Sequence, residues 1–267
     1  MASMFTWDIE SDEDEESSAL SRSGIHLLVF LVDASVKMKN SLVGDENTSA
    51  FQTFQTSLGC AHATIMNKVL NSPKDRIAVI SFGNPPDATK DSVYHSVRQV
   101  IPLSVPSTEN ILMLEDLMDG ESGLKEFEGK FGFGELCDVK LHEALWKCQE
   151  VFGSYKGKVG MQTIVLLTNN DKPHAHDSRL DQLTRRKAGD LHGSHVKIDV
   201  VPVCNVTDNF NMEHFYGHLV KLADDTEPIT KTDINDLANL VIRRTNIKRS
   251  NGEFGNENAP INNRKLI

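Results

Sequence analysis

Two polar stretches at the ends of apolar runs carry the residues best suited to chemistry. Asp33 and Ser35 directly follow the apolar run 27–32, and Asn169 follows the apolar run 163–168. A carboxylate and a hydroxyl side by side suit a hard divalent cation, because Mg²⁺ and Ca²⁺ prefer oxygen ligands and accept water at the remaining positions. A divalent-cation site at the ends of these runs is therefore the first hypothesis.

The apolar runs are the elements that must position those residues. Continuous apolar runs of this length are typical of strands buried on both faces of a parallel sheet. The predicted strands are 27–32, 77–83, 93–101, 163–168 and 196–203, with a short one near Ile229. The predicted helices are 51–70, one or two short ones within 102–130, and then 139–152, 178–192, 212–223 and 233–244.

This alternation of strands and helices predicts an α/β fold. We expect a doubly wound, mostly parallel six-stranded sheet with helices on both faces and one antiparallel edge strand. Ligands of such sheets bind beyond the carboxyl ends of the strands, where the segments after 27–32 and 163–168 should meet residues 134–139. The domain should occupy residues 25–249, after a disordered acidic leader (1–24) and before a flexible tail (250–267).

Charge and composition exclude several classes of protein. The net charge of −10 makes the chain a poor candidate for an autonomous DNA-binding domain, because cationic side chains drive binding to phosphates. No stretch reaches the roughly 18 apolar residues of a membrane helix, and the acidic amino terminus is no signal peptide. The four cysteines form no C-x-x-C pair, which indicates reduced thiols in a reducing compartment.

The order of the motifs resembles the von Willebrand factor A domain. The segments 31–35, 77–83 and 165–169 fit its first strand and two later core strands. That resemblance implies a metal site built on D-x-S-x-S, a distant Thr and a late Asp. Here Lys37 stands at the second serine, residues 134–138 offer no clear Thr, and Asn169 replaces the Asp. We therefore expect Asp33, Ser35 and Asn169 to be the remnant of a metal site, with no metal and no cofactor.

A closer resemblance is to the amino-terminal domain of the Ku 70-kilodalton subunit. The strings that carry it are Thr168-Asn169-Asn170-Asp171-Lys172-Pro173-His174 and Lys187-Ala188-Gly189-Asp190-Leu191. The resemblance implies a nuclear subunit of DNA double-strand-break repair by non-homologous end joining that also acts in telomere maintenance. It implies three kinds of partner: the second, 80-kilodalton type subunit, end-joining and telomere proteins, and DNA ends, which this stretch alone should bind only weakly.

Two charged stretches are candidate interaction sites. The first is the helix 178–192, which is either a plain solvated face or a surface for end-joining and telomere proteins, as the Ku resemblance implies. Its candidate residues are Arg179, Asp181, Arg185, Arg186, Lys187 and Asp190. The second stretch is either a nuclear import signal or a phosphate contact, although a helix C-terminus also explains part of it. It consists of Arg243, Arg244, Lys248 and Arg249.

Enzyme activity has little support in the sequence. No G-x-x-x-x-G-K-[ST] loop is present to cradle a nucleotide phosphate, although Ku subunits are described as helicase-like ATPases. The family is also credited with an abasic-site lyase that uses a Schiff-base lysine just before the first strand. Here that stretch reads Ser21-Arg22-Ser23, and arginine cannot replace lysine because its guanidinium stays protonated. We expect a non-catalytic interaction domain; the alternatives are a metal-dependent adhesion-type A domain and a lyase.

Overall fold

The computed structural model describes residues 24–43, 51–86, 94–135, 139–174, 177–205, 208–220 and 234–246. The strands are β1 (Ile25–Asp33), β2 (Leu42–Val43), β3 (Phe51–Gln52), β4 (Arg76–Phe82), β5 (Val97–Ser104), β6 (Val159–Thr168) and β7 (Val196–Pro202). The helices are α2 (Val36–Asn40), α3 (Thr53–Asn71), α4 (Thr108–Met118), α5 (Gly120–Lys130), α6 (Leu141–Ser154), α7 (Ser178–Gly193), α8 (Gly217–Val220) and α9 (Ile234–Thr245), with a 3-10 turn η2 (Met212–His214).

The central sheet has the strand order β5-β4-β1-β6-β7. β1 pairs in parallel with β4 and with β6, and β6 pairs in parallel with β7. β5 runs antiparallel to β4 at one edge. The predicted α/β fold, with its mostly parallel sheet and antiparallel edge strand, is confirmed. The described sheet contains five strands rather than six, and the sixth predicted strand, near Ile229, lies outside the described residues.

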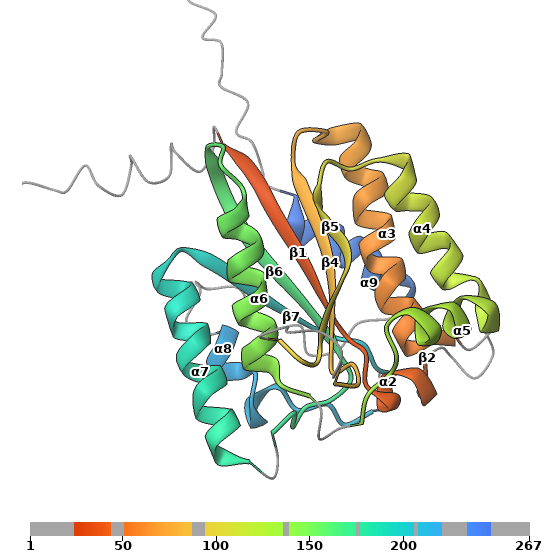
Figure 1. Ribbon diagram of the computed structural model, residues 1–267, viewed down its shortest axis with the longest axis vertical. Coiled ribbons are helices and arrows are strands. Elements are labelled where there is room, and N and C mark those ends of the chain that lie inside the picture. Colours follow the sequence, from red (N-terminus) through yellow and green to blue (C-terminus); the bar gives the residue numbers. More distant parts are fainter. Residues whose placement is uncertain are drawn as a thin grey trace, which may run out of the picture.

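Helices cover both faces of the sheet (Figure 1). The side chains of β1 show why, because successive residues of a strand point to opposite faces. Val29 and Leu31 pack in the cluster that contains α6 and α7, whereas Leu28 and Phe30 pack in the cluster that contains α3 and α9. All four side chains are fully buried. This double burial produces the unbroken apolar run that the sequence shows.

The segment between β1 and α3 is more ordered than its sequence predicts. Instead of a plain loop, its described residues form α2 and the β2–β3 ribbon. A five-residue helix and two-residue strands are too short to show a hydrophobic period, so pattern reasoning misses them. Met38 and Val43 are the buried residues that attach this segment to the core.

The predicted helix 212–223 is also corrected in part. Its described portion is split into η2 and α8, and residues 221–223 lie outside the described ranges. The turn between the two places Tyr216 in the core, where its hydroxyl donates to the Asn170 carbonyl oxygen at 3.0 Å. None of the helices in the described ranges has the length and apolar character needed to span a bilayer.

Candidate functional site: the carboxyl edge of the sheet and helix α7

The segments that follow β1 and β4 meet Gly134 at the carboxyl end of the sheet, near α2 at the lower right of Figure 1. Ser35 forms an isolated parallel bridge with Gly134. The Val36 N–H donates to the Gly134 carbonyl oxygen at 2.8 Å, and the Gly134 N–H donates to the Ala34 carbonyl oxygen at 3.2 Å. A Cβ at position 134 would lie 2.4 Å from the Gly83 carbonyl oxygen, so only glycine permits this approach. The predicted contact between the segment after β1 and residues 134–139 is therefore confirmed at Gly134.

Asp33 is the buried centre of this edge. Its Oδ1 accepts a hydrogen bond from the Ser35 N–H at 2.9 Å, and its Oδ2 accepts one from the Thr168 hydroxyl at 2.7 Å. Thr168 Oγ1 in turn accepts from the Asn170 N–H at 3.1 Å. Burial raises the pKa of Asp33, while the hydrogen bonds and the Lys37 ammonium oppose the increase. The carboxylate therefore ties β1 to the loop that follows β6.

The A-domain resemblance implies a divalent cation here, and the contacts test that fit. Two buried oxygens, Ser35 Oγ and Asn169 Oδ1, have no hydrogen-bond partner in the described part of the chain. Lys37 Nζ, however, donates to the Asn169 carbonyl oxygen at 2.9 Å. Within that part, no three His, Cys, Asp or Glu side chains are grouped to hold a metal. The residues do not fit a divalent cation, because a tethered ammonium already supplies the positive charge.

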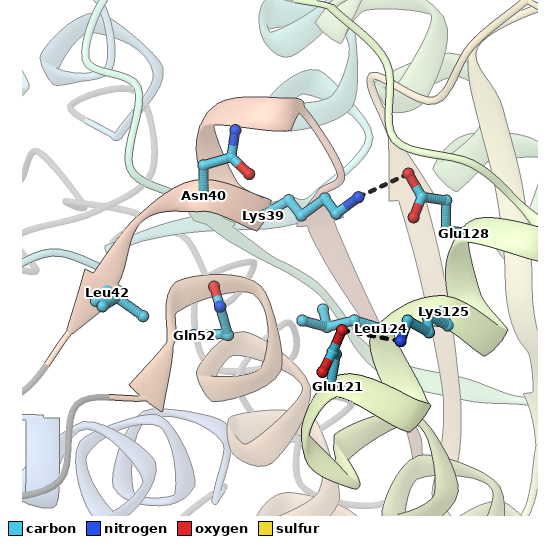
Figure 2. Close-up of a pocket in the computed structure, with 8 residues that line it drawn as sticks. All are labelled: Lys39, Asn40, Leu42, Gln52, Glu121, Leu124, Lys125 and Glu128. Atoms are coloured by element: carbon cyan, nitrogen blue, oxygen red, sulfur yellow. Dashed lines mark hydrogen bonds and ion pairs between the residues drawn. The ribbon is translucent and has the colours of Figure 1, made fainter.

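Two hollows flank this edge. One, of about 310 Å³, lies beside Lys37 and Asn169. The other, of about 430 Å³, lies between α2, the β2–β3 ribbon and α5. Figure 2 shows Lys39 reaching across the second hollow to Glu128, and Lys125 lying against Glu121. The N–O distances of these ion pairs are 2.6 and 2.8 Å, so the charges drawn there are paired and do not indicate a charged ligand.

Helix α7 carries the predicted interaction residues on two sides. Asp177 caps the helix by accepting from the N–H groups of Arg179 and Leu180. Arg185 Nε donates to both carboxylate oxygens of Asp181 at 3.0 and 3.1 Å. Its guanidinium also lies 5.2 Å from the Phe215 ring centroid. This pair therefore faces η2 and α8 and is only half exposed.

The other predicted interaction residues of α7 differ in their exposure to solvent. Arg179, Arg186 and Asp190 are exposed, whereas Lys187 is only 3% exposed. Lys187 Nζ lies 3.1 Å from the centroid of the Trp146 ring on α6 and donates to Gln149 Oε1. Burial lowers the pKa of Lys187. Lys187 thus joins α7 to α6 instead of extending into solvent.

Trp146 is the surface residue that sequence reasoning missed. Its side chain is 49% exposed, although it lies on a helix whose other large apolar side chains are buried. A signal was present in the sequence. The helical period predicts that Leu141, Ala144, Leu145 and Cys148 face the core, and Trp146 does not belong to this set, so the sequence alone indicates that it points away from the core.

Comparison with known proteins decides the family. The Ku70/Ku80 N-terminal alpha/beta domain matches residues 27–251 of the chain. The chain belongs to this Ku family. A relative from Mus musculus, "X-ray repair cross-complementing protein 6", is 32% identical over 206 residues, which are 77% of this chain and 32% of the relative. A relative from Rhipicephalus appendiculatus, "ATP-dependent DNA helicase 2 subunit 1", is 30% identical over 214 residues, 80% of this chain and 33% of the relative.

The Ku domain also has the fold of von Willebrand A domains. A crystal structure of the SpRpn10 VWA domain superposes with a TM-score of 0.50 at 16% identity, covering 81% of this chain and 95% of that one. At this identity the similarity concerns the fold alone. Both predicted resemblances, to A domains and to Ku, are therefore confirmed. The chain spans about a third of the length of the curated relatives named above.

The basic residues near the end of this Ku domain do not form one exposed patch in the described structure. Arg243 is exposed. Arg244 is only partly exposed, and its guanidinium donates to Asp199 Oδ1 on β7 at 2.7 Å. Lys248 and Arg249 lie outside the described residues, as does the Ser21-Arg22-Ser23 stretch. Arg244 thus contacts the sheet, which leaves Arg243 as the exposed basic residue of the described part of this stretch.

Proposed function

We propose that this chain is a non-catalytic protein-interaction domain of a Ku-like subunit that acts in DNA double-strand-break repair. Family membership over residues 27–251 supports the Ku part of the proposal. The name of the mouse relative refers to repair, which supports the pathway. In this proposal the subunit works in the nucleus, in non-homologous end joining and at telomeres, and binds DNA ends only when paired with the second Ku subunit.

The observation that carries the interaction role is the exposed, charged outer side of α7. Arg179, Arg186 and Asp190 extend from a helix that is capped at Asp177 and packed against the sheet through Ala188 and Leu191. A rigid helix whose exposed charges form no ion pair with other described residues is suited to protein recognition, because charge placement sets specificity and association rate. The carboxyl edge, where A domains bind ligands through a metal, is instead occupied by internal contacts of Asp33 and Lys37.

A quantitative pull-down from nuclear extract tests the proposal. The bait is the chain itself, compared with Arg186→Glu on α7 and with Arg243→Glu on α9 as the matched control. Both arginines are exposed, so neither variant should affect folding. We expect end-joining proteins to be recovered by the wild type and the control and to be lost by Arg186→Glu. Equal recovery of those proteins by all three baits, or recovery by none, would contradict the proposal.

A further inference from the structure

Helices α6 and α7 run side by side (Figure 1), and each carries one large exposed apolar side chain. Trp146 on α6 is 49% exposed and Leu183 on α7 is 39% exposed. Leu183 precedes Lys187 by four residues, so it lies on the same side of α7, the side that meets Trp146. We call Trp146, Leu183, Lys187, Arg179 and Arg186 the α6–α7 patch.

Trp146 is held in place by the residues around it. The Lys187 ammonium lies over one face of the indole and is fixed by its hydrogen bond to Gln149. A buried cation over an aromatic ring favours one ring orientation, because the attraction depends on facing the π-surface. An aromatic side chain that is already oriented loses little conformational entropy when a partner covers it. Such residues are the usual anchors of protein interfaces.

On the α7 side of this centre, two of the three exposed charged side chains are positive. Among the described residues Arg179 and Arg186 are exposed and form no ion pair, in contrast to Arg185, which is paired with Asp181. Asp190 is the one exposed acid on this side of α7. The two guanidinium groups give this side of α7 a local excess of positive charge over its single exposed carboxylate. Arginine side chains of this kind recognise carboxylates through paired N–H donors.

From these observations we infer that the α6–α7 patch binds an acidic segment of a partner protein that inserts an aromatic or long aliphatic side chain beside Trp146. In this arrangement Trp146 and Leu183 contact the apolar side chain, and Arg179 and Arg186 pair with its flanking carboxylates. The inference deepens the proposed function by giving the partner's chemistry, and it rests on that proposal for the existence of a protein partner.

Selection from a random peptide library displayed on phage tests this inference. The chain is the bait, and peptides that also bind a Trp146→Ala/Arg186→Gln variant are removed. We expect the remaining peptides to be net acidic with an aromatic or leucine anchor. Their affinity should fall about tenfold or more in Trp146→Ala, as is usual for an aromatic anchor. It should also weaken as salt is increased. Peptides that are net basic, or no peptides that depend on these residues, would overturn the inference.

Matched variants keep the test independent of folding. Leu183→Ser provides a second change at the patch, and Leu112→Ser alters a leucine on α4 that is 54% exposed. Only Leu183→Ser should weaken the selected peptides, while thermal melting should be similar for both. Weakening by Leu112→Ser to the same degree would contradict the assignment. If Arg186→Glu abolished recovery of nuclear proteins but no peptide depended on Trp146, this inference would fail and the proposed function would stand.

Discussion

Asp33 joins neighbouring segments through its two carboxylate oxygens. One oxygen accepts from the Ser35 N–H and the other from the Thr168 hydroxyl, at the point where β1 and β6 end. A hydrogen bond to a buried charge contributes about 1.5–3 kcal/mol, and a donor left without a partner costs a similar amount. The residue is therefore structural, although an aspartate followed by a serine is also the beginning of a metal motif.

Replacing Asp33 should lower stability without involving a metal. We expect Asp33→Ala to reduce the free energy of unfolding by about 2–4 kcal/mol, because the Ser35 N–H and the Thr168 hydroxyl lose their acceptor. Urea denaturation with and without millimolar Mg²⁺ measures this change. We also expect Mg²⁺ to leave the wild type unchanged, since Lys37 already provides a cation. A clear stabilisation of the wild type by Mg²⁺ that Asp33→Ala abolishes would instead support a metal-dependent A domain.

Arg185 and Arg186 are neighbours in sequence with different surroundings, so they form a natural pair of variants. Arg185→Ala should lower the free energy of unfolding by about 1 kcal/mol, since it loses the ion pair with Asp181 and the contact with Phe215. Arg186→Ala should stay within about 0.5 kcal/mol of the wild type, because its side chain is exposed. Chemical denaturation of both variants measures these changes. Equal losses of unfolding free energy would contradict the difference in surroundings between the two arginines.

At the scale of elements, buried charges fix α9 to the rest of the domain. Lys68 on α3 is 1% exposed, and its ammonium lies 2.8 Å from Asp75 Oδ2 and 3.4 Å from the Thr245 carbonyl oxygen of α9. Asp75 Oδ1 accepts from the His26 N–H of β1 at 3.1 Å. One ion pair therefore holds a helix, a strand and the carboxyl end of α9 together.

Removing one member of this pair should be more damaging than removing both. We expect Lys68→Met to lower the free energy of unfolding by about 3–5 kcal/mol, because Asp75 is left charged and buried. The double variant Lys68→Met/Asp75→Asn should be more stable than Lys68→Met, because no uncompensated charge remains. A double-mutant cycle in urea measures the coupling. A double variant less stable than Lys68→Met would show that the unpaired Asp75 carboxylate carries no such penalty.

The elements also show where sequence reasoning reaches its limit. β1, β4 and β6 are predictable because burial on both faces leaves long apolar runs, and α7 is predictable from its length and charge. α2 and the β2–β3 ribbon are too short to leave a period, and their position depends on tertiary contacts of Met38 and Val43. The charged residues of α7 can be identified from the sequence. Which of them is paired, buried or exposed depends on contacts with α6 and with the segment of η2 and α8, and the sequence does not show these contacts.

At the scale of the whole molecule, buried histidines link stability to pH. His26 is 1% exposed, and its Nε2 lies 2.9 Å from Thr163 Oγ1. Burial and the nearby Lys68 lower the pKa of His26 to about 3. Burial and His142 lower the pKa of His174 to about 4. In both cases the unfolded chain binds a proton at a higher pH than the folded chain does.

Stability should therefore decrease on acidification. The contribution of His26 is complete above its unfolded pKa of about 6.5 and is lost as the pH falls toward its folded value, by up to about 1.4 kcal/mol per pH unit. We expect His26→Gln, which can keep the bond to Thr163, to lose less stability than the wild type between pH 7 and pH 5. Urea denaturation at the two pH values measures the difference, and equal losses in both proteins would contradict this description of His26.

For the molecule as a whole, we propose that this domain binds proteins and that it does not bind DNA ends on its own. An acidic chain with an overall charge of −10 offers few sites for phosphate neutralisation, and Arg244 is already paired with Asp199. The deciding measurement is the affinity of the isolated chain for a linear DNA duplex at physiological salt, compared with a closed circular duplex of the same sequence. We predict a dissociation constant weaker than about 1 µM, with no preference for ends. Nanomolar binding that requires free ends would contradict this proposal.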